Sequence, residues 1–417
     1  MIQVGELNLS SGKRSEVVES ECVKFVRHLG ESLFHQGRYA SALRCFEEMS
    51  PIEREGHPLV ASRMAVCCSY LNRMEDAQCY FSQALAQDSI AQVHWDYAHH
   101  LLKNGYFEEG WRQYRLGRSV NHFTTPISLT ENQMLWDGVY RPDSTLEIVC
   151  EVSISDQILF AAFFPELLSR AHTVGMRVVV NCDASLKGLF QSSFSRATIV
   201  PWELCSGRRH EQQFTVSNPY RLKVRQSDLP IYVSQPKRAA YLNPDEGEVR
   251  RIRSILANGQ THMRVGVVGG WVDEEWQSCD GGAAELSVVR AVLGCKHGSV
   301  RVFDLNAGRE EIRRNGNVSS ELRVEPGDMN SIAALMREMH VVVGVDSALA
   351  NVSGALGCDT RVLLRGRAHW CWGREDRERS WYPYAKGYWE RIAGGGSSPA
   401  EQLLADLVGM SAVNVSQ

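Results

Sequence analysis

The sequence lacks the features that mark metal-bound, disulfide-linked or nucleic-acid-binding proteins. Its 12 cysteines include no C-x-x-C pair and no Cys/His spacing typical of a zinc site. Its 45 Lys and Arg residues stand against 49 Asp and Glu, so the net charge of -4 gives no basic excess for nucleic acid. We therefore expect no metal, no disulfide framework and no nucleic-acid partner.

Long apolar runs are missing as well. No stretch of about 18 apolar residues and no N-terminal signal segment occur, so we expect no membrane span, a cytoplasmic location and reduced thiols. The adjacent Cys67 and Cys68 lie in an apolar helical pattern and are interpreted as small core residues. With 44% hydrophobic and 23% charged residues, the composition is typical of a folded chain rather than a disordered one.

The first third of the chain repeats itself. A small residue that lets two helices approach recurs at Ala42, Ala77 and Gly110, with separations of 35 and 33 residues. Other positions recur in phase, among them Gly37, Asn72, Gly105, Tyr39, Phe107, Phe46, Phe81 and Tyr114. This period matches a helix-turn-helix unit of about 34 residues, and residues 20–120 resemble the tetratricopeptide (TPR) family. Three such units would stack into a short solenoid whose concave groove binds a protein partner; a structural prop or a dimerisation surface are the alternatives.

A linker and two α/β halves follow. We expect the TPR helical repeat domain over 1–125 and a linker over 126–145, where prolines break the helical period. Beyond it, short apolar runs alternate with helical stretches, which predicts parallel sheets covered by helices on both faces. The expected halves are 146–246 and 247–417, both Rossmann-like.

The element boundaries follow from the same alternation, with residues 207–243 expected to be an irregular connection. Strands are expected at Leu146–Val152, Arg177–Cys182, Ala197–Pro201, Met263–Val268, Val300–Leu305, Val341–Val345 and Arg361–Leu364. Helices are expected at Gln157–Val174, Gly247–Leu256, Ala283–Leu293, Met329–Met339 and Leu349–Leu356.

Loops that follow parallel strands are where ligands bind in such folds. Asp156 follows the first expected strand and opens a helix, where a carboxylate acts either as an N-cap or as a catalytic base. Asp346, Ser347 and Ala348 follow Val341–Val345 at another helix start, where a phosphate group or a structural cap are the two interpretations.

A third group of residues combines amides and aromatic rings. Asn306 follows the strand Val300–Leu305, and Trp372 lies in an aromatic-rich stretch with Trp370 and Trp381. Such groups stack on a base or a sugar ring in a binding site, although tryptophans are also common in cores and domain contacts.

The order of these segments carries a family resemblance. The stretches NGYFEEGWRQYR, LWDGVYRPDSTLEIVCEVSISDQILFAAFFPELL, RVFDLNAG, VVVGVDSALANVSGALG and WCWGREDRERSWYP, in this order, resemble bacterial TPR proteins that carry a GT-B glycosyltransferase domain. Those domains are related to heptosyltransferases and similar in arrangement to O-GlcNAc transferases. The resemblance extends from about residue 20 to 410.

The resemblance implies roles for individual residues. Asp156 would be the general base on the acceptor hydroxyl, and Asn306, Asp346, Ser347, Ala348 and Asn351 would bind the nucleotide-sugar. Further donor or acceptor contacts would come from Glu151, Ser153, Ser155, Gln157, Trp271 and Trp372. The nucleotide-sugar would be a co-substrate, and the scheme requires no metal and no other cofactor. The protein acceptor would be recruited by the TPR groove. Whether the chain forms a homo-oligomer is left open by the resemblance.

Three departures from the family pattern support an alternative. The glycines of the family's Gly-Glu-Gln-Gly-x-Gly-Asp stretch are all replaced in Cys150–Asp156, and Asn351 stands where the family usually has His. The loop 269–276 is acidic, where a basic or amide-bearing loop would contact phosphates. Two hypotheses therefore remain: an active glycosyltransferase, or an inactive TPR/GT-B-like adaptor that binds a protein partner.

Overall fold

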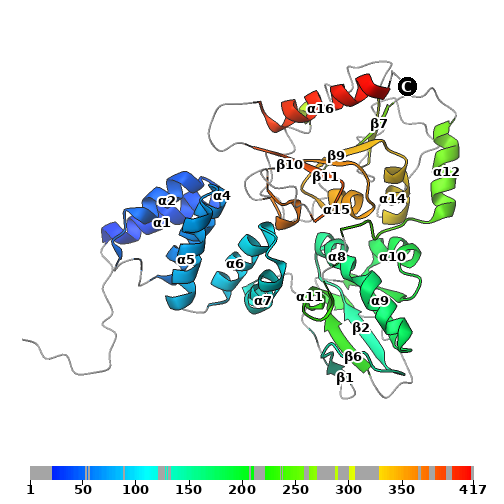
Figure 1. Ribbon diagram of the computed structural model, residues 1–417, viewed down its shortest axis with the longest axis horizontal. Helices are drawn as coiled ribbons and strands as arrows, with labels where there is room; N and C mark the ends of the chain where they lie inside the picture. The colour runs from blue at the N-terminus through cyan, green and yellow to red at the C-terminus, as the bar shows by residue number, and fades with distance from the viewer. Residues whose placement is uncertain are drawn as a thin grey trace, which may run out of the picture. The chain divides into compact units, whose positions relative to one another are not determined.

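A computed structural model gives the fold of residues 21–51, 54, 57–87, 90–120, 127, 129, 133–205, 208–210, 221–234, 236, 238–257, 263–269, 287–289, 300–305, 328–364, 368–374, 381–390 and 397–414. The chain divides into two compact units, Met1–Val93 and His94–Gln417 (Figure 1).

The first unit is built from antiparallel helix pairs. Its helices are α1 (Glu21–His35), α2 (Tyr39–Glu47), α4 (Pro58–Tyr70) and α5 (Met74–Gln87). The core between them contains the predicted small residues Ala42 and Ala77, both fully buried, together with Cys67 and Cys68. The two cysteines are therefore core residues, as predicted, and burial raises the pKa of the Cys67 thiol to about 12.

The turn of the repeat has the same geometry three times. Gly37, Asn72 and Gly105 all have positive φ, at 73°, 62° and 80°. After each of them an N–H donates to a carbonyl five residues back, as Arg38 does to Leu33 at 2.9 Å, which closes the preceding helix. Glycine takes this conformation without strain, and asparagine is among the few other residues that take it often. The predicted period of the repeat is thus confirmed at its turns.

The second unit opens with a third helix pair of the same kind. α6 (Ala91–Lys103), which begins at the end of the first unit, and α7 (Phe107–Gly117) are joined at Gly105. Gly110 lies so close to α6 that an added Cβ atom would come within 2.7 Å of the Leu102 side chain. The predicted small residue is therefore needed for the approach of the two helices.

The first sheet of this unit has the strand order β1-β6-β2-β3-β4-β5 and is parallel except for β5. Its strands are β1 (Gln133–Leu135), β2 (Thr145–Val149), β3 (Arg177–Asp183), β4 (Thr198–Cys205), β5 (Arg208–His210) and β6 (Arg221–Arg225). The helices of this half are α8 (Ile154–Phe160), α9 (Phe164–Thr173), α10 (Lys187–Ser193) and α11 (Leu229–Tyr232), with 3-10 turns at Arg118–Val120, Ala161–Phe163, Ala184–Leu186 and Gln226–Asp228.

The expectation of an irregular connection over 207–243 was wrong, because β6 lies inside it and pairs with both β1 and β2. β6 carries the charged residue Lys223 in the middle of the sheet, where only 3% of it is exposed. Its ammonium lies 3.7 Å from the Glu147 carboxylate on β2, which compensates the charge. Strand β1 lies within the segment expected to be a linker.

The second sheet is entirely parallel, with the order β11-β10-β9-β7-β8. Its strands are β7 (Met263–Val268), β8 (Val300–Asp304), β9 (Val341–Val345), β10 (Thr360–Leu364) and β11 (Ala385–Trp389). The other elements of this half are α12 (Glu246–Ala257), α14 (Met329–Arg337), α15 (Ala348–Ala355), the 3-10 turn Trp370–Trp372 and α16 (Pro399–Asn414).

Both faces of the second sheet are buried, which explains why β9 consists of four valines and one glycine. Val341, Val343 and Val345 pack in one cluster with residues of α16, whereas Val342 packs in the other with residues of α14 and α15. Two parallel sheets with helices on both sides agree with the predicted Rossmann-like halves.

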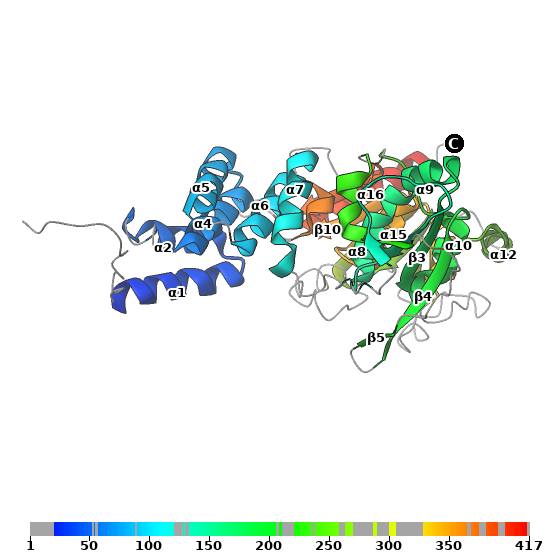
Figure 2. The ribbon, with the colours of Figure 1, turned by 90° about the horizontal axis from the view of Figure 1, so that it is seen from below.

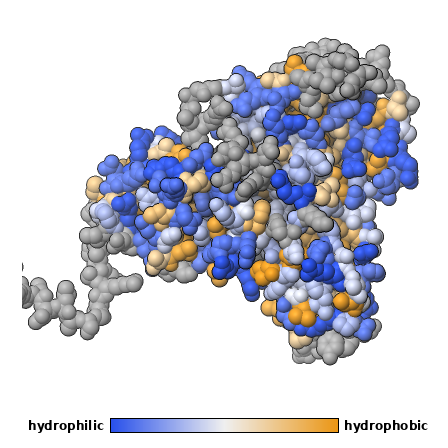
Figure 3. All heavy atoms as spheres, viewed as in Figure 1, coloured by the Kyte–Doolittle hydropathy of each residue, from blue (hydrophilic) through white to orange (hydrophobic). Residues whose placement is uncertain are grey.

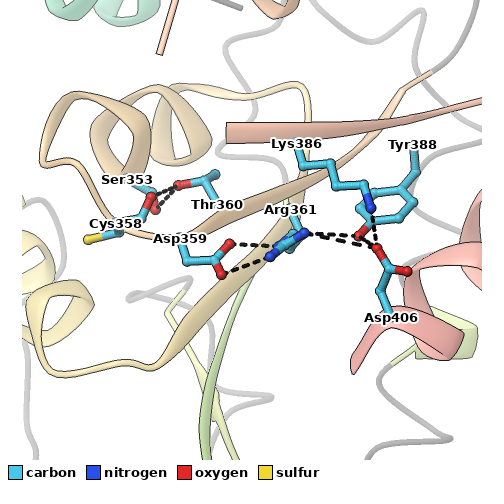
Figure 4. A network of polar contacts seen from close by, with 8 residues as sticks. All are labelled: Ser353, Cys358, Asp359, Thr360, Arg361, Lys386, Tyr388 and Asp406. Atoms are coloured by element: carbon cyan, nitrogen blue, oxygen red, sulfur yellow. Dashed lines mark hydrogen bonds and ion pairs between the residues drawn. The ribbon is translucent and has the colours of Figure 1, made fainter. Parts of the chain in front are cut away.

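The amino edge of this sheet carries a polar network that holds α16 (Figure 4). The Tyr388 hydroxyl on β11 donates to the Asp406 carboxylate on α16 at 2.6 Å, and Lys386 pairs with the same carboxylate. Arg361 on β10 forms a two-pronged contact with Asp359, with its Nε at 2.6 Å. Arg361 and Lys386 are the second residues of β10 and β11, so both lie near the amino edge of the sheet.

In the face shown in Figure 3, hydrophilic residues cover most of the described surface and apolar residues form small groups. No helix in the described part of the chain is both long and apolar enough to cross a membrane.

Candidate functional site

The carboxyl ends of β2 and β9 lead into the two helices that bring the halves of the second unit together. β2 is followed by α8 and β9 by α15, and α8 and α15 lie side by side (Figures 1 and 2). Ligands of parallel sheets bind beyond such carboxyl ends, so the residues at these two helix starts define the candidate site.

Asp156 lies in the first turn of α8 and is partly exposed. Its backbone N–H donates to the Ser153 hydroxyl at 3.4 Å, so Ser153, and not Asp156, is the N-cap of this helix. Ser155 lies beside Asp156 in the same turn and is also partly exposed. The Asp156 side chain is therefore not the cap of this helix.

Glu151 and Gln157 fix this loop to its own half. Gln157 is fully buried; its amide nitrogen donates to the Glu151 carbonyl at 2.7 Å and its amide oxygen accepts from the Asp183 N–H at 2.9 Å. The Glu151 carboxylate accepts from the Ser227 N–H at 3.2 Å. These polar contacts hold the loop that carries Asp156 in place without glycines.

Asp346 follows β9 and clamps the loop 368–374. Its carboxylate accepts from the His369 N–H and from the Trp372 indole N–H, both at 2.7 Å. Burial raises the pKa of Asp346, while these two hydrogen bonds and the charge of Lys103 act in the opposite direction. Ser347 caps α15 through a hydrogen bond from the Ala350 N–H at 3.3 Å, and Ala348 is the first residue of that helix.

Asn351 lies one turn into α15 and is buried. Its side-chain oxygen accepts from the Tyr382 hydroxyl at 2.9 Å and from the Cys371 thiol at 3.7 Å. Burial raises the pKa of the Cys371 thiol well above its usual value, and the carboxylates of Asp346 and Asp156 raise it further. Asp156 and Asp346 follow strands of different sheets, and the helices α8 and α15 that begin beside them contact each other.

A cluster of aromatic side chains packs against the loop 368–374. Trp111 of α7 lies edge-on to Trp370 at 5.3 Å and to Trp381 at 6.2 Å between ring centroids, and it also contacts Phe160 and Phe163. The predicted tryptophan Trp372 is buried, with its ring 5.3 Å from that of Tyr382. These rings join α7, the first half and the loop 368–374 into one core.

Of the predicted site residues, Asp156 lies at the start of α8, Asp346, Ser347, Ala348 and Asn351 lie at the start of α15, and Trp372 contacts Asp346. Their predicted roles stay predictions. The sequence analysis did not identify α6 as part of this region: His99 has its ring 6.3 Å from that of His369, and Asn104 binds Arg374. The only sequence signal was the basic last turn of α6, with His100 and Lys103 ahead of Asn104-Gly105. Trp271, Asn306 and all but the first residue of the loop 269–276 lie outside the described residues.

A metal site is not formed by the part of the chain that the structure describes, since no three His, Cys, Asp or Glu side chains gather there in a way that could hold an ion. The prediction of metal-independent chemistry stays a prediction.

No family model matches the chain. Protein FlbA of Caulobacter vibrioides is 23% identical over 346 residues, which cover 74% of this chain and 54% of that protein, so the chain spans about half the length of this relative.

Solved glycosyltransferase structures are similar to the chain at low sequence identity. A glycosyl transferase family 9 protein from Veillonella parvula is 12% identical and covers 66% of this chain and 98% of its own, with a TM-score of 0.41. The ADP-heptose lps heptosyltransferase II of E. coli is 13% identical and covers 65% and 99%, with a TM-score of 0.40. An O-GlcNAc transferase of Thermobaculum terrenum is 11% identical and covers 85% and 84%, with a TM-score of 0.23.

Proposed function

We propose that the chain is a glycosyltransferase of GT-B arrangement that moves a sugar from a nucleotide-sugar to an acceptor hydroxyl without a metal. The observation that carries the proposal is the convergence of Asp156 and Asp346. They follow β2 and β9, which belong to different sheets, and the helices that begin beside them, α8 and α15, pack against each other. Two-sheet sites of this kind suit a reaction between two substrates, one held by each half.

Asp156 is the proposed general base. It is partly exposed, so an acceptor hydroxyl can reach it, and the buried contacts of Gln157 fix its loop. The hydroxyl oxygen forms the new bond to the anomeric carbon and its proton passes to Asp156. The bond from that carbon to the diphosphate oxygen breaks, and the nucleoside diphosphate leaves with the electron pair.

The donor side is proposed to lie at the start of α15. Ser347 and Ala348 stand at the positive end of the helix dipole, which favours the negative charge on a leaving diphosphate. Asp346 acts in this account by holding the loop 368–374 through the His369 and Trp372 N–H groups. Asn351 fixes the Tyr382 hydroxyl from the next turn of the same helix.

The helix pairs are proposed to be TPR units that recruit a protein acceptor. The three turns at Gly37, Asn72 and Gly105 support this assignment, because they share both their positive φ and their hydrogen-bond pattern. Their spacing of 35 and 33 residues is that of the TPR family.

The proposal is tested by titrating the full chain with UDP, GDP, ADP and CMP and with their sugars, following thermal unfolding. A ligand at about 100 times its dissociation constant adds about 2.7 kcal/mol of stability. We expect one nucleotide family to raise the melting temperature and Asp346→Asn to reduce the shift, while Asp406→Asn at the opposite sheet edge leaves it unchanged. No shift with any nucleotide, together with capture of a protein by the full chain, would leave the adaptor as the function.

A further inference from the structure

Two basic side chains meet at the carboxyl edge of the second sheet, and one of them comes from α6. Lys103, the last residue of α6, has its ammonium nitrogen 4.8 Å from the ring centroid of Trp389, the last residue of β11. Arg374, at the end of the loop 368–374, donates from Nη1 to the side-chain oxygen of Asn104 at 2.9 Å. Residues 270 positions apart in the chain thus form one cluster.

The cluster is rigidly held. Asn104 and Arg374 are both buried, and the Asn104 amide nitrogen donates to the His100 carbonyl at 2.7 Å. The carbonyl groups of Leu101 and Leu102, at the end of α6, accept from the Tyr106 and Gly105 N–H groups. The helix end is therefore closed by its own turn, and Asn104 aims the Arg374 guanidinium.

The charges of the cluster repel one another. Burial lowers the pKa of Lys103 to about 7; Arg374 lowers it further, whereas Asp346 raises it. Burial also lowers the pKa of His100 to about 4, with Arg374 and Lys103 acting in the same direction. Among the described residues, the Asp346 carboxylate acts on Lys103, and it also accepts two hydrogen bonds from the loop 368–374. A multivalent anion would relieve this repulsion.

As a whole residue, Lys103 keeps part of its surface exposed, whereas Arg374 is buried. We propose that Lys103 and Arg374 form a subsite for phosphate groups, with Asn104 as the residue that positions Arg374. In naming the ligand as the diphosphate of a nucleotide-sugar, this inference rests on the proposed function. The third helix pair then completes the donor site itself, in addition to any role in recruiting an acceptor.

The test measures binding of inorganic pyrophosphate and of nucleoside diphosphates to the full chain by calorimetry near pH 7. Lys103→Met should weaken binding at least about tenfold, and Lys386→Met, the same change at the amino edge of the same sheet, should leave it unchanged. Asn104→Ala should weaken binding with Lys103 intact. Because the pKa of Lys103 is near 7, anion binding should also take up protons, seen as a heat that depends on the buffer, and Lys103→Met should abolish this uptake.

The results separate the subsite from the proposed function. Pyrophosphate binding that depends on Lys103, in a chain that turns over no nucleotide-sugar, supports the subsite and contradicts the glycosyltransferase. Sugar transfer or nucleotide binding that is unchanged in a folded Lys103→Met variant overturns the subsite and leaves the glycosyltransferase standing. Absence of pyrophosphate binding by the folded wild-type chain also overturns the subsite.

Discussion

The Asp346 carboxylate accepts the indole N–H of Trp372 at 2.7 Å and thereby ties the end of β9 to the loop 368–374. Asp346→Asn places an amide where both the Trp372 and His369 N–H groups donate, so one donor loses its partner. We expect a loss of about 1–3 kcal/mol in the free energy of unfolding and a changed near-ultraviolet circular dichroism of the tryptophans. Asp359→Asn, which disturbs an ion pair at the opposite edge, should cost less than about 1 kcal/mol. Equal losses of unfolding free energy in the two variants would show that the hydrogen bonds of Asp346 to the loop 368–374 do not stabilise the fold.

Gly344 in β9 has no room for a side chain. A Cβ atom there would lie 2.3 Å from Val268 Cγ2 and 2.8 Å from the Val268 carbonyl oxygen on the neighbouring β7, and the backbone oxygen cannot move aside. Gly344→Ala should therefore cost about 2 kcal/mol or more, measured by urea unfolding.

The matched control for this change is Gly188→Ala, where the nearest atom is Asn330 Cβ at 3.3 Å. Because Gly188 lies in helix α10, the helix preference for alanine offsets the tight contact and the net change should be small. A Gly344→Ala variant as stable as Gly188→Ala would contradict the packing of β7 against β9.

Acid should destabilise the second unit through its buried histidines. Burial lowers the pKa of His369 to about 3, and His99 lowers it further; the pKa of His99 itself is also lowered by burial. Because the folded pKa values lie below the unfolded value of about 6.5, the unfolded chain binds more protons in this range. The contribution of these groups is complete above about pH 6.5 and is lost as the pH falls toward 3.

Urea unfolding as a function of pH measures this effect. His369→Gln should reduce the loss of stability between pH 6.5 and pH 4, whereas His172→Gln on the exposed side of α9 should leave the pH profile unchanged. Identical profiles for the two variants would mean that the contact between α6 and the loop 368–374 has no part in the acid response.

Much of the fold could be predicted from local patterns. The bounds of β7 and β9 agree with the prediction because Met263–Val268 and Val341–Val345 consist of apolar residues and glycine, apart from Arg264. The turns at Gly37, Asn72 and Gly105 were found by period alone. Strand β6 was missed because its charged residue Lys223 is compensated by Glu147, a partner 76 residues away. β11 was missed because Lys386 interrupts a short edge strand.

The site could be predicted only in part, for the same reason. Asp156 and Asp346 were found because each follows an apolar strand. The role of Asp346 as a clamp depends on Trp372, and the place of Lys103 depends on Trp389 and Arg374, which lie far along the chain. Such contacts are set by tertiary packing and leave no local pattern.

The most direct test of the account is the release of nucleoside diphosphate from a nucleotide-sugar by the wild-type chain and by Asp156→Asn. The account predicts turnover of one nucleotide-sugar family, falling about 10²- to 10⁴-fold in Asp156→Asn while nucleotide binding and thermal stability stay the same. Glu166→Gln, the same change on exposed α9, should leave the rate unchanged. Equal turnover by wild type and Asp156→Asn, or none by the folded wild type with any nucleotide-sugar, would contradict it.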